Sequence, residues 1–339
     1  MEILQNISIK RYNTFGLDIK AKYFCVVKTK EEFIEVMQSN TFKNNTHLIL
    51  GGGSNILFTE DYQGLIIKNE MKGIEVVKEN EKHIEIAVSS GEIWHDLVLY
   101  CITNNWGGIE NMSLIPGTVG AAPIQNIGAY GKEIKDYLVK VEVIDKASLK
   151  TSYFDNQNCV FDYRNSIFKS KLKGKYFISK VFLKLDKSPH KINVKYGDIL
   201  STLTQNNISK PNIKDVSDAV IEIRQSKLPD PSKLGNAGSF FKNPIISQKA
   251  FDEFIIKHPS APHYIVGKDA IKIPAGWLIE QIGWKGKVIG QTGSHKKQAL
   301  VLVNYGQAKG EEIKQLALNI IDSVKKHFNI EIEPEVNII

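Results

Sequence analysis

The chain has 339 residues, 42% of them hydrophobic and 24% charged, which is the composition of an ordinary globular protein. A single hydrophobic core rarely extends over so many residues, so we expect two or three domains. The 44 basic and 37 acidic residues give a formal net charge of +7. This mild excess fits the binding of polyanionic small molecules or weak contact with nucleic acid, and it establishes neither.

Three cysteines, Cys25, Cys101 and Cys159, lie far apart and form no C-x-x-C pair. The pattern argues against a zinc ribbon and against a disulfide framework, and we expect no metal site. The N-terminus lacks the basic start and apolar stretch of a signal peptide, and no stretch approaches the roughly 18 apolar residues of a membrane-spanning helix. We therefore expect a cytoplasmic protein, in the reducing environment that unpaired thiols indicate.

The hydrophobic pattern predicts short strands and helices in alternation over the first third of the chain. In chain order we expect a strand at 23–28, a helix at 30–39, a buried strand at 47–58 that runs into a glycine turn, strands at 64–69 and 83–91, and a helix at 93–106. A glycine-dense segment follows at 107–131, and then strands at 138–145 and 176–185.

A polar run at 206–216 marks a change of character, and we place a domain boundary near residue 216. The helix that follows is stopped by Pro229 and Pro231. Further helices are predicted at 276–283 and 310–328, with a strand at 299–305 between them and a last strand in the tail at 330–339.

The stretch G-G-G-S-N, Gly51 to Asn55, directly follows a strand of leucine and isoleucine. Three glycines let the backbone adopt positive φ and come close to a ligand, and their successive N–H groups form a nest for an anion. The stretch matches neither the dinucleotide-binding fingerprint nor the Walker loop. On the glycines alone, a tight turn and a phosphate cradle are equally good interpretations.

The segment S-L-I-P-G-T-V-G-A-A-P-I-Q-N-I-G-A-Y-G, Ser113 to Gly131, carries little side-chain bulk, so something large is expected to lie against its backbone. Another segment or a flat ligand meets that requirement, and the scarcity of large apolar residues favours the ligand. Gln125 and Asn126 offer donors and acceptors that suit the edge of a flavin or a purine. With the first glycine stretch, this indicates a pyrophosphate-containing cofactor and leaves flavin and nicotinamide dinucleotides open.

The stretch G-N-A-G-S-F-F-K-N-P, Gly235 to Pro244, places one serine before two phenylalanines. A serine nucleophile needs a partner histidine and usually a G-x-S-x-G turn, so a hydrolase is disfavoured. Ser239 is instead a candidate proton donor to a carbanion, with Phe240 and Phe241 excluding water. On residue chemistry alone, a turn serine before a strand remains the better interpretation.

Arg164 stands among aromatic residues in F-D-Y-R-N-S-I-F, where a guanidinium is suited to a bidentate pair with a carboxylate. Glu335, in I-E-P-E-V-N-I-I near the C-terminus, has the chemistry of an acid or an electrostatic partner. Taken singly, each is better interpreted as a surface residue: an arginine stacked on a tyrosine, and an exposed strand residue.

These segments occur together, in order, over nearly the whole chain: N-T-F-G-L-D-I-K-A-K-Y-F, L-G-G-G-S-N-I-L, I-P-G-T-V-G-A-A-P-I-Q-N-I-G-A-Y-G, D-Y-R-N-S-I-F-K, K-L-P-D-P with G-N-A-G-S-F-F-K-N-P, and P-E-V. In them the chain closely resembles the UDP-N-acetylenolpyruvoylglucosamine reductases, flavoenzymes of peptidoglycan precursor synthesis. The stretch K-Y-G-D-I at 195–199 resembles the longer type of this family, which carries an extra tyrosine loop.

The resemblance implies an α+β fold: a two-part α/β module that binds FAD, similar to that of the PCMH or vanillyl-alcohol-oxidase type, and a smaller α/β substrate-binding domain. The implied parts are FAD-binding subdomains at 1–70 and 71–215, the substrate-binding domain at 216–328, and a tail at 329–339 that returns to the active site.

The resemblance also implies a reaction. NADPH reduces non-covalently bound FAD and leaves, and the enolpyruvyl sugar nucleotide then occupies the same site. Hydride passes from N5 of the flavin to C3 of the enolpyruvyl group, and protonation at C2 gives UDP-N-acetylmuramate. An oxidoreductase of cell-wall biogenesis, required for cell shape and cell division, is therefore expected.

We expect a monomer without nucleic-acid or membrane partners.

Matching the family's motifs to this sequence implies a role for each residue. Ser239 is matched to the proton donor, and Arg164 and Glu335 to the pair that polarises the substrate carboxyl and stabilises the enolate. The implied substrate-binding residues are Tyr196, which closes over the uridine side, Arg224, Lys227, Asn243 and Gln298. The implied cofactor-binding residues are Gly51, Gly52, Gly53, Ser54, Asn55, Pro116, Gly117, Thr118, Gly120, Ala121, Gln125, Asn126, Gly128, Ala129 and Tyr130.

One position departs from the family, which commonly ends its last motif P-E-V-R where this chain has Asn337. If that arginine orients the glutamate, Glu335 must be oriented in another way here. Two alternatives stay open: a different flavoprotein oxidase acting on an alcohol or lactone, and a nucleotide-binding protein without enzymatic activity. Neither glycine segment contains a histidine for a covalent flavin, and the joint presence of Ser239, Arg164 and Glu335 argues against the second alternative.

Overall fold

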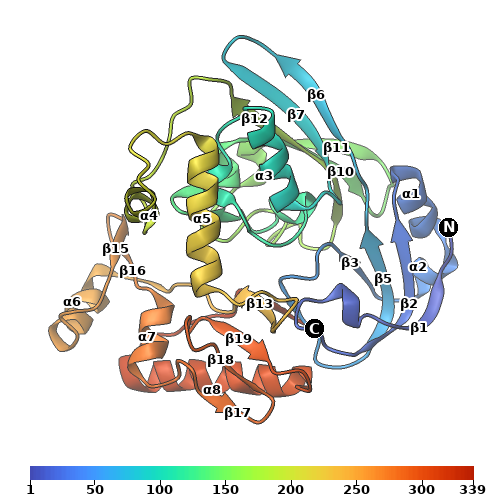
Figure 1. Ribbon diagram of the computed structural model, residues 1–339. Coiled ribbons are helices and arrows are strands. Elements are labelled where there is room, and N and C mark those ends of the chain that lie inside the picture. Colours follow the sequence, from blue (N-terminus) through green and yellow to red (C-terminus); the bar gives the residue numbers. More distant parts are fainter. The chain divides into compact units, whose positions relative to one another are not determined.

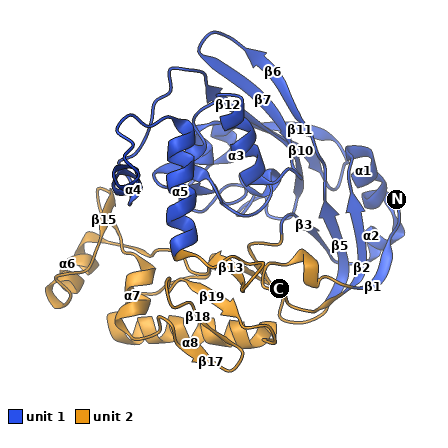
Figure 2. Ribbon diagram, in the orientation of Figure 1, with its two compact units in different colours: residues 1–7, 21–52, 62–226 blue, residues 8–20, 53–61, 227–339 orange.

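The computed structural model describes residues 1–339 (Figure 1), which form two compact units (Figure 2). Unit 1 consists of Met1–Ile7, Ala21–Gly52 and Tyr62–Ser226, and unit 2 of Ser8–Lys20, Gly53–Asp61 and Lys227–Ile339. The chain thus passes from unit 1 to unit 2 inside the glycine turn at 51–55. No helix combines the length and the apolar character that crossing a membrane requires.

The first sheet of unit 1 has the order β1-β2-β5-β3, and β5 pairs in parallel with both of its neighbours. Helix α1 begins at a capping box in which the Thr29 hydroxyl accepts from the backbone N–H of Glu32. Its Phe33, Val36 and Met37 are buried against this sheet. The elements are β1 (Leu4–Ser8), β2 (Lys20–Val27), α1 (Lys30–Gln38), α2 (Asn40–Asn44), β3 (His47–Leu50) and β5 (Tyr62–Asn69).

The second sheet of unit 1 is antiparallel, with the order β11-β10-β12-β7-β6. Helix α3 packs its buried residues into the core formed by this sheet, and α4 and α5 share a smaller core of their own. The elements are β6 (Ile74–Glu79), β7 (His83–Ser89), α3 (Trp94–Thr103), β8 (Gly128–Ala129), β9 (Lys132–Glu133), β10 (Leu138–Asp145), β11 (Thr151–Asp155), β12 (Tyr176–Asp186), α4 (Ile199–Gln205) and α5 (Ile213–Lys227).

Unit 2 is built on the sheet β13-β19-β18-β17, with a small sheet β14-β16-β15 and a short parallel pair of β20 with β4. Helix α8 is amphipathic and buries Ile313, Leu316 and Ile320 along one face. The elements are β4 (Ile56–Leu57), β13 (Gly235–Ser239), β14 (Ile245–Ile246), α6 (Gln248–Lys257), β15 (Tyr264–Gly267), β16 (Ala270–Lys272), α7 (Ala275–Gln281), β17 (Val288–Ile289), β18 (Thr292–Ser294), β19 (Val301–Asn304), α8 (Gly310–Phe328) and β20 (Asn337–Ile338).

The sequence pattern predicts most of these elements, and it is wrong about the tail. Of the strand expected over 330–339, only Asn337–Ile338 pairs as a strand. Pro334 has no N–H to donate, and it makes only an isolated bridge with Phe241. The boundary expected near residue 216 lies inside α5, whose Val216 and Val220 belong to the core shared with α4 in unit 1. The finer division into subdomains and tail stays a prediction.

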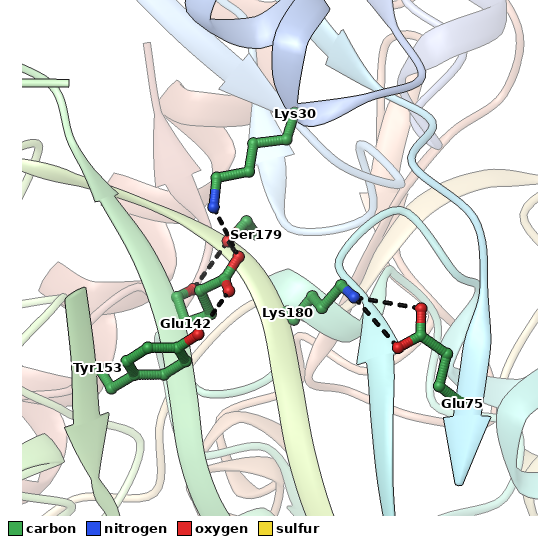
Figure 3. A network of polar contacts seen from close by, with 6 residues as sticks. All are labelled: Lys30, Glu75, Glu142, Tyr153, Ser179 and Lys180. Carbon is green, nitrogen blue, oxygen red and sulfur yellow. Dashed lines mark hydrogen bonds and ion pairs between the residues drawn. The ribbon is translucent and has the colours of Figure 1, made fainter. Parts of the chain in front are cut away.

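A buried carboxylate on the second sheet bonds to the start of α1, the helix that packs against the first sheet (Figure 3). Glu142 on β10 is 8% exposed and accepts from Ser179 Oγ at 2.7 Å, Tyr153 Oη at 3.0 Å and Lys30 Nζ at 3.3 Å. Burial alone raises the pKa of Glu142, but the two hydroxyl hydrogen bonds and the charge of Lys30 outweigh it, so the net pKa is lowered. The three donors therefore stabilise the ionised form where the two sheets of unit 1 are connected.

We expect Glu142→Ala to lower the free energy of unfolding by about 1–3 kcal/mol, because it leaves partly buried donors without their acceptor. The difference from the unmodified chain should be full above the unfolded pKa of about 4.3 and should shrink as the pH falls through the lowered folded pKa. Urea denaturation at several pH values measures both effects.

The matched control is Glu75→Ala, which removes the neighbouring pair drawn in Figure 3. Glu75 meets Lys180 at 3.2 Å, but its side chain is 66% exposed, so the cost should stay below about 1 kcal/mol. Equal destabilisation by the two variants would contradict the assignment of the buried network.

Candidate active site

Two glycine-bearing stretches of unit 1 lie against each other. A Cβ added to Gly52 would stand 2.9 Å from the Cα of Gly117, and one added to Gly51 would collide with the Thr118 hydroxyl. Lys68 Nζ donates to the carbonyl oxygen of Gly51 at 2.8 Å. Gly52 therefore allows the approach of another backbone, and Gly51 makes room for the Thr118 hydroxyl. This approach gathers the peptide groups of both stretches in one place.

Neighbouring protein also explains part of the glycine content between 113 and 131. A Cβ on Gly120 would collide with Ser90, and one on Gly128 would stand 2.6 Å from the Lys132 carbonyl oxygen. Asn126 is fully buried, and its amide bonds to Glu133 and Asp162 as donor and to the Lys135 N–H as acceptor. The Asn126 side chain thus serves the fold and does not supply the free amide edge that the sequence interpretation expected of it.

Gln125 and Tyr130 have different surroundings from Asn126. Gln125 is half-buried, and its Oε1 accepts from Lys169 Nζ at 3.3 Å. Tyr130 has a left-handed backbone with φ of 48°, and its ring packs against the core of α4 and α5. A non-glycine residue at positive φ is strained, and such residues persist where the surrounding structure demands them.

Arg164 is presented by a tight turn. The backbones of Asp162 and Asn165 exchange hydrogen bonds at 3.1 Å, which forces Arg164 to a φ of 52°. Its Nη2 donates to the carbonyl oxygen of Gly128 at 3.1 Å, and its guanidinium lies 5.8 Å from the centre of the Tyr163 ring. The predicted stacking on a tyrosine is present, and the turn also directs the arginine at the glycine segment.

Arg224, on α5, faces the same region of unit 1. Burial lowers the pKa of its guanidinium, Tyr130 raises it, and the positive charge of Arg164 lowers it further. Its Nε is buried and has no hydrogen-bond partner. The guanidinium groups of Arg164 and Arg224 are thus close enough to repel each other, and Arg224 has a buried N–H without a partner. Such a site favours the binding of an anion.

Tyr196 lies on the loop between β12 and α4, and the residue is 44% exposed. A Cβ on Gly131 would stand 3.3 Å from this ring, and one on Gly197 would stand 3.3 Å from the ring of Tyr130. Two neighbouring residues of the loop, Tyr196 and Gly197, therefore pack against two neighbouring residues at the end of the glycine segment, Gly131 and Tyr130. Unit 1 brings Arg164, Arg224 and the two tyrosines together.

Ser239 and Glu335 lie on adjoining segments of unit 2. The Glu335 N–H donates to the carbonyl oxygen of Phe240 at 2.7 Å, so the tail runs beside the end of β13. Phe240 and Phe241 are buried, with Phe240 packed edge-on against Phe15, whereas Ser239 is exposed. The expectation that the two rings shield the hydroxyl from water is wrong: they anchor the strand in the core and leave the hydroxyl at the surface.

Asn337, the departure from the family motif, bonds to the glycine turn. Its backbone N–H and its Nδ2 both donate to the Asn55 carbonyl oxygen, at 3.1 and 3.0 Å. In return Asn55 Nδ2 donates to the Glu335 carbonyl oxygen at 3.4 Å. Gly53 lies in the same turn, where a Cβ would collide with the Tyr12 carbonyl group. The tail that carries Glu335 is thus held to Asn55 by its backbone and by two amide side chains.

The remaining predicted substrate residues of unit 2 divide into two groups. Asn243 and Gln298 each lie against the start of α7. Asn243 Oδ1 accepts from the Ala275 N–H at 2.9 Å, and a Cβ on Gly276 would stand 3.1 Å from Gln298 Oε1. Lys227 forms the second group: it is exposed and is the last residue of α5.

Sequence reasoning missed a set of buried polar residues that hold the glycine segment in place. Asn111 is fully buried and donates to the Asn193 carbonyl oxygen at 2.9 Å, which links the segment to the Tyr196 loop. Ser113 and Ser217 share a hydrogen bond of 2.8 Å, which links it to α5. The available signal was the presence of asparagine and serine among apolar residues in E-N-M-S-L-I-P.

The residues of unit 1 fit an FAD cofactor. Two backbones without side chains meet at Gly52 and Gly117, and peptide N–H groups in such a turn suit a pyrophosphate. The uncharged Thr118 hydroxyl lies beside Gly51 and can both donate and accept. The backbone contact between the two glycine stretches is the structural observation that carries this fit.

Comparison with known proteins covers both units. The FAD binding domain pattern matches residues 21–148, and the pattern of the C-terminal domain of UDP-N-acetylenolpyruvoylglucosamine reductase matches residues 230–339. A UDP-N-acetylenolpyruvoylglucosamine reductase of Flavobacterium johnsoniae is 52% identical over 339 residues, 100% of both chains. One of Bacteroides fragilis is 42% identical over 335 residues, 99% of each chain.

The fold of the reductase from Thermus caldophilus is similar, with a TM-score of 0.68 and 21% identity over 99% of this chain and 98% of that one. A 6-hydroxy-D-nicotine oxidase from Arthrobacter nicotinovorans aligns with a TM-score of 0.53 and 10% identity, over 97% of this chain and 86% of that one. The predicted α+β fold with an FAD-binding module is confirmed. By its full-length identity to the curated relatives, the chain belongs to the family of UDP-N-acetylenolpyruvoylglucosamine reductases, which are FAD-dependent oxidoreductases.

Proposed function

We propose that this protein reduces UDP-N-acetylglucosamine enolpyruvate to UDP-N-acetylmuramate, a step of peptidoglycan precursor synthesis, with NADPH as the reductant. Identity of 52% over the whole chain to a curated reductase carries the proposal. The joint presence of Ser239, Arg164 and Glu335 supports it from the residues. We place the reaction in the cytoplasm and assign it to a monomer.

Unit 1 is assigned the cofactor and the substrate carboxylate. The glycine stretches and Tyr130 would hold FAD, which when bound supplies the hydride for C3 of the enolpyruvyl group. Arg164 and Arg224 would pair with the carboxylate of that group. Because an α,β-unsaturated carboxylate gains negative charge when it accepts hydride, fixed guanidinium donors lower the energy of the transition state.

Unit 2 is assigned the protonation step. Ser239 Oγ would give its proton to C2, which with the hydride at C3 completes the addition of two hydrogens across the double bond. The exposure of Ser239 supports this role, since solvent has access to return the proton to the oxygen. Glu335 would act on the developing enolate, from a tail bonded to the Phe240 carbonyl oxygen next to the serine.

The sugar nucleotide is assigned to the remaining polar residues. Asn243 and Gln298, which each lie against the start of α7, would bind the diphosphate and the sugar together with Lys227. Tyr196 would close over the uridine side, and its exposure and its loop position support that movement. The roles of these four residues follow from the family motif.

Reduction of the flavin and its reoxidation distinguish this proposal from a flavoprotein oxidase. Without oxygen, NADPH should bleach the yellow enzyme, and the enolpyruvyl sugar nucleotide should restore the colour with one UDP-N-acetylmuramate formed per flavin. Stopped-flow absorbance and chromatography of the product measure this, with NADH and oxygen as comparison reagents. Reoxidation by oxygen alone, with no lactyl product, would favour the oxidase.

We expect Ser239→Ala to keep reduction of the flavin by NADPH and to slow reoxidation by the sugar nucleotide roughly 10²–10⁴-fold, the usual contribution of a general acid. The two half-reactions are measured separately under argon. Ser232→Ala removes an exposed hydroxyl of the same unit that bonds to Asp230, and it should change neither rate. Unchanged turnover in Ser239→Ala would show that the proton comes from elsewhere.

We expect Gly52→Ala to weaken flavin binding, because the new methyl group would stand 2.9 Å from the Cα of Gly117 and push the two backbones apart. The ratio of flavin to protein absorbance after gel filtration measures the effect. Circular dichroism of the variant checks that unit 1 still folds. A folded variant that retains full flavin would mean that this contact does not shape the cofactor site.

A further inference from the structure

Glu92 and the first residue of α3, Trp94, make hydrogen bonds to backbone groups in the middle of the glycine segment. Trp94 N–H donates to the Gly117 carbonyl oxygen at 3.0 Å, and the indole Nε1 donates to the Met112 carbonyl oxygen at 3.0 Å. The Val119 N–H donates to the Glu92 carbonyl oxygen at 2.8 Å. Hydrogen bonds from residues 92–94 thus bracket residues 112–119, which include three of the proposed flavin-binding positions.

A fourth bond in this set ends on a titratable atom. The Leu114 N–H donates to His95 Nδ1 at 2.9 Å. Leu114 has a φ of 58°, a left-handed conformation that costs free energy for any residue with a Cβ. Because Nδ1 accepts this bond, the imidazole must be neutral, with its proton on Nε2. His95 therefore helps to hold a strained residue two positions before Pro116.

Two charged groups act on His95, Asp96 on its own helix and Arg224 on α5. Burial lowers the pKa of His95, Asp96 raises it, and Arg224 lowers it; the net pKa is lowered. Helix α5 also holds the segment one residue earlier, through the bond of Ser217 to Ser113. Ser217 and Arg224 lie about two helical turns apart, so one face of α5 carries both.

We propose that His95 is a positioning residue for the flavin: its neutral ring holds Leu114 in place and thereby keeps residues 116–118 in the conformation that binds FAD. This inference rests on the proposed assignment of that segment to FAD. Protonation of His95 would set an N–H donor against the Leu114 N–H and place a second positive charge near Arg224. The bond would break, and the strained backbone would be free to relax.

The expected consequence is loss of flavin in acid at a pH where the protein is still folded. The folded pKa of His95 is below its ordinary value, so FAD retention should be complete at neutral pH and should fall as the pH drops through the lowered pKa. Holoenzyme is equilibrated between pH about 8 and about 4, and released FAD is measured by its fluorescence. Circular dichroism of the same samples reports global folding.

Three variants test the inference. In His95→Asn, Oδ1 takes the place of Nδ1 as acceptor and does not titrate, so FAD should be retained at pH 7 and the loss in acid should disappear. In His95→Phe the ring shape is kept without an acceptor, and FAD should bind about tenfold more weakly at every pH. His83→Asn, which removes a histidine of β7 that bonds to Asp186, should release FAD as the unmodified enzyme does.

The outcome for His95→Asn decides the inference even if His95→Phe fails to fold. Loss of FAD in acid that is unchanged in His95→Asn would overturn it, and so would full retention in a folded His95→Phe. Either result leaves the proposed reduction of the sugar nucleotide intact, provided the unmodified enzyme forms the product. An unmodified protein that binds no FAD at neutral pH would contradict both proposals.

Discussion

The candidate site depends on the close approach of two backbones, at Gly52 and Gly117, where a Cβ would stand 2.9 Å from the opposite Cα. Neither stretch can carry a side chain there, so both present peptide groups to whatever lies beside them. The helix α3 holds one stretch through Gly117, and Lys68 holds the other through Gly51. Helix α3 and strand β5, which carries Lys68, thus keep the two glycine stretches of unit 1 together.

Positive charge and strained backbone are concentrated around the same segment of unit 1. Arg164, Tyr130 and Leu114 all have left-handed φ values, and each is held by bonds or packing from a different element. Arg224 adds a buried guanidinium whose Nε has no partner. Strain and unpaired polar groups reduce stability, and a fold that retains them together indicates a site shaped for a ligand. Burial, and after it the charge of Arg164, lower the pKa of Arg224, and an anion between the two guanidinium groups would oppose both effects.

Periodic segments could be predicted from the sequence because burial of one face leaves a repeat in the chain. The strand at 138–145 and the helix at 310–328 have the predicted bounds. Close approach could be predicted as well, since glycine at 51 and 52 signals it, but the partner could not: Gly117 is more than sixty residues away along the chain. The role of Asn126 was missed for the same reason. An asparagine buried in the fold and one that faces a ligand look identical in the sequence. The shielding of Ser239 was mispredicted because the sequence does not reveal whether adjacent aromatic rings pack into the core or over the neighbouring serine.

The resemblance to the family implies an arginine where this chain has Asn337, and the fold shows what an amide supplies at that position. The position of Glu335 is defined first by backbone bonds, from its own N–H to Phe240 and from the N–H of residue 337 to Asn55. Any residue at 337 except proline would make the second bond. The side chain of Asn337 adds a second bond to the same Asn55 carbonyl oxygen, without charge. Orientation of the tail therefore does not need an arginine, and what the substitution removes is a positive charge beside the glycine turn. In a chain with a formal net charge of +7, other cations are available to attract a pyrophosphate, and Lys68 already reaches Gly51.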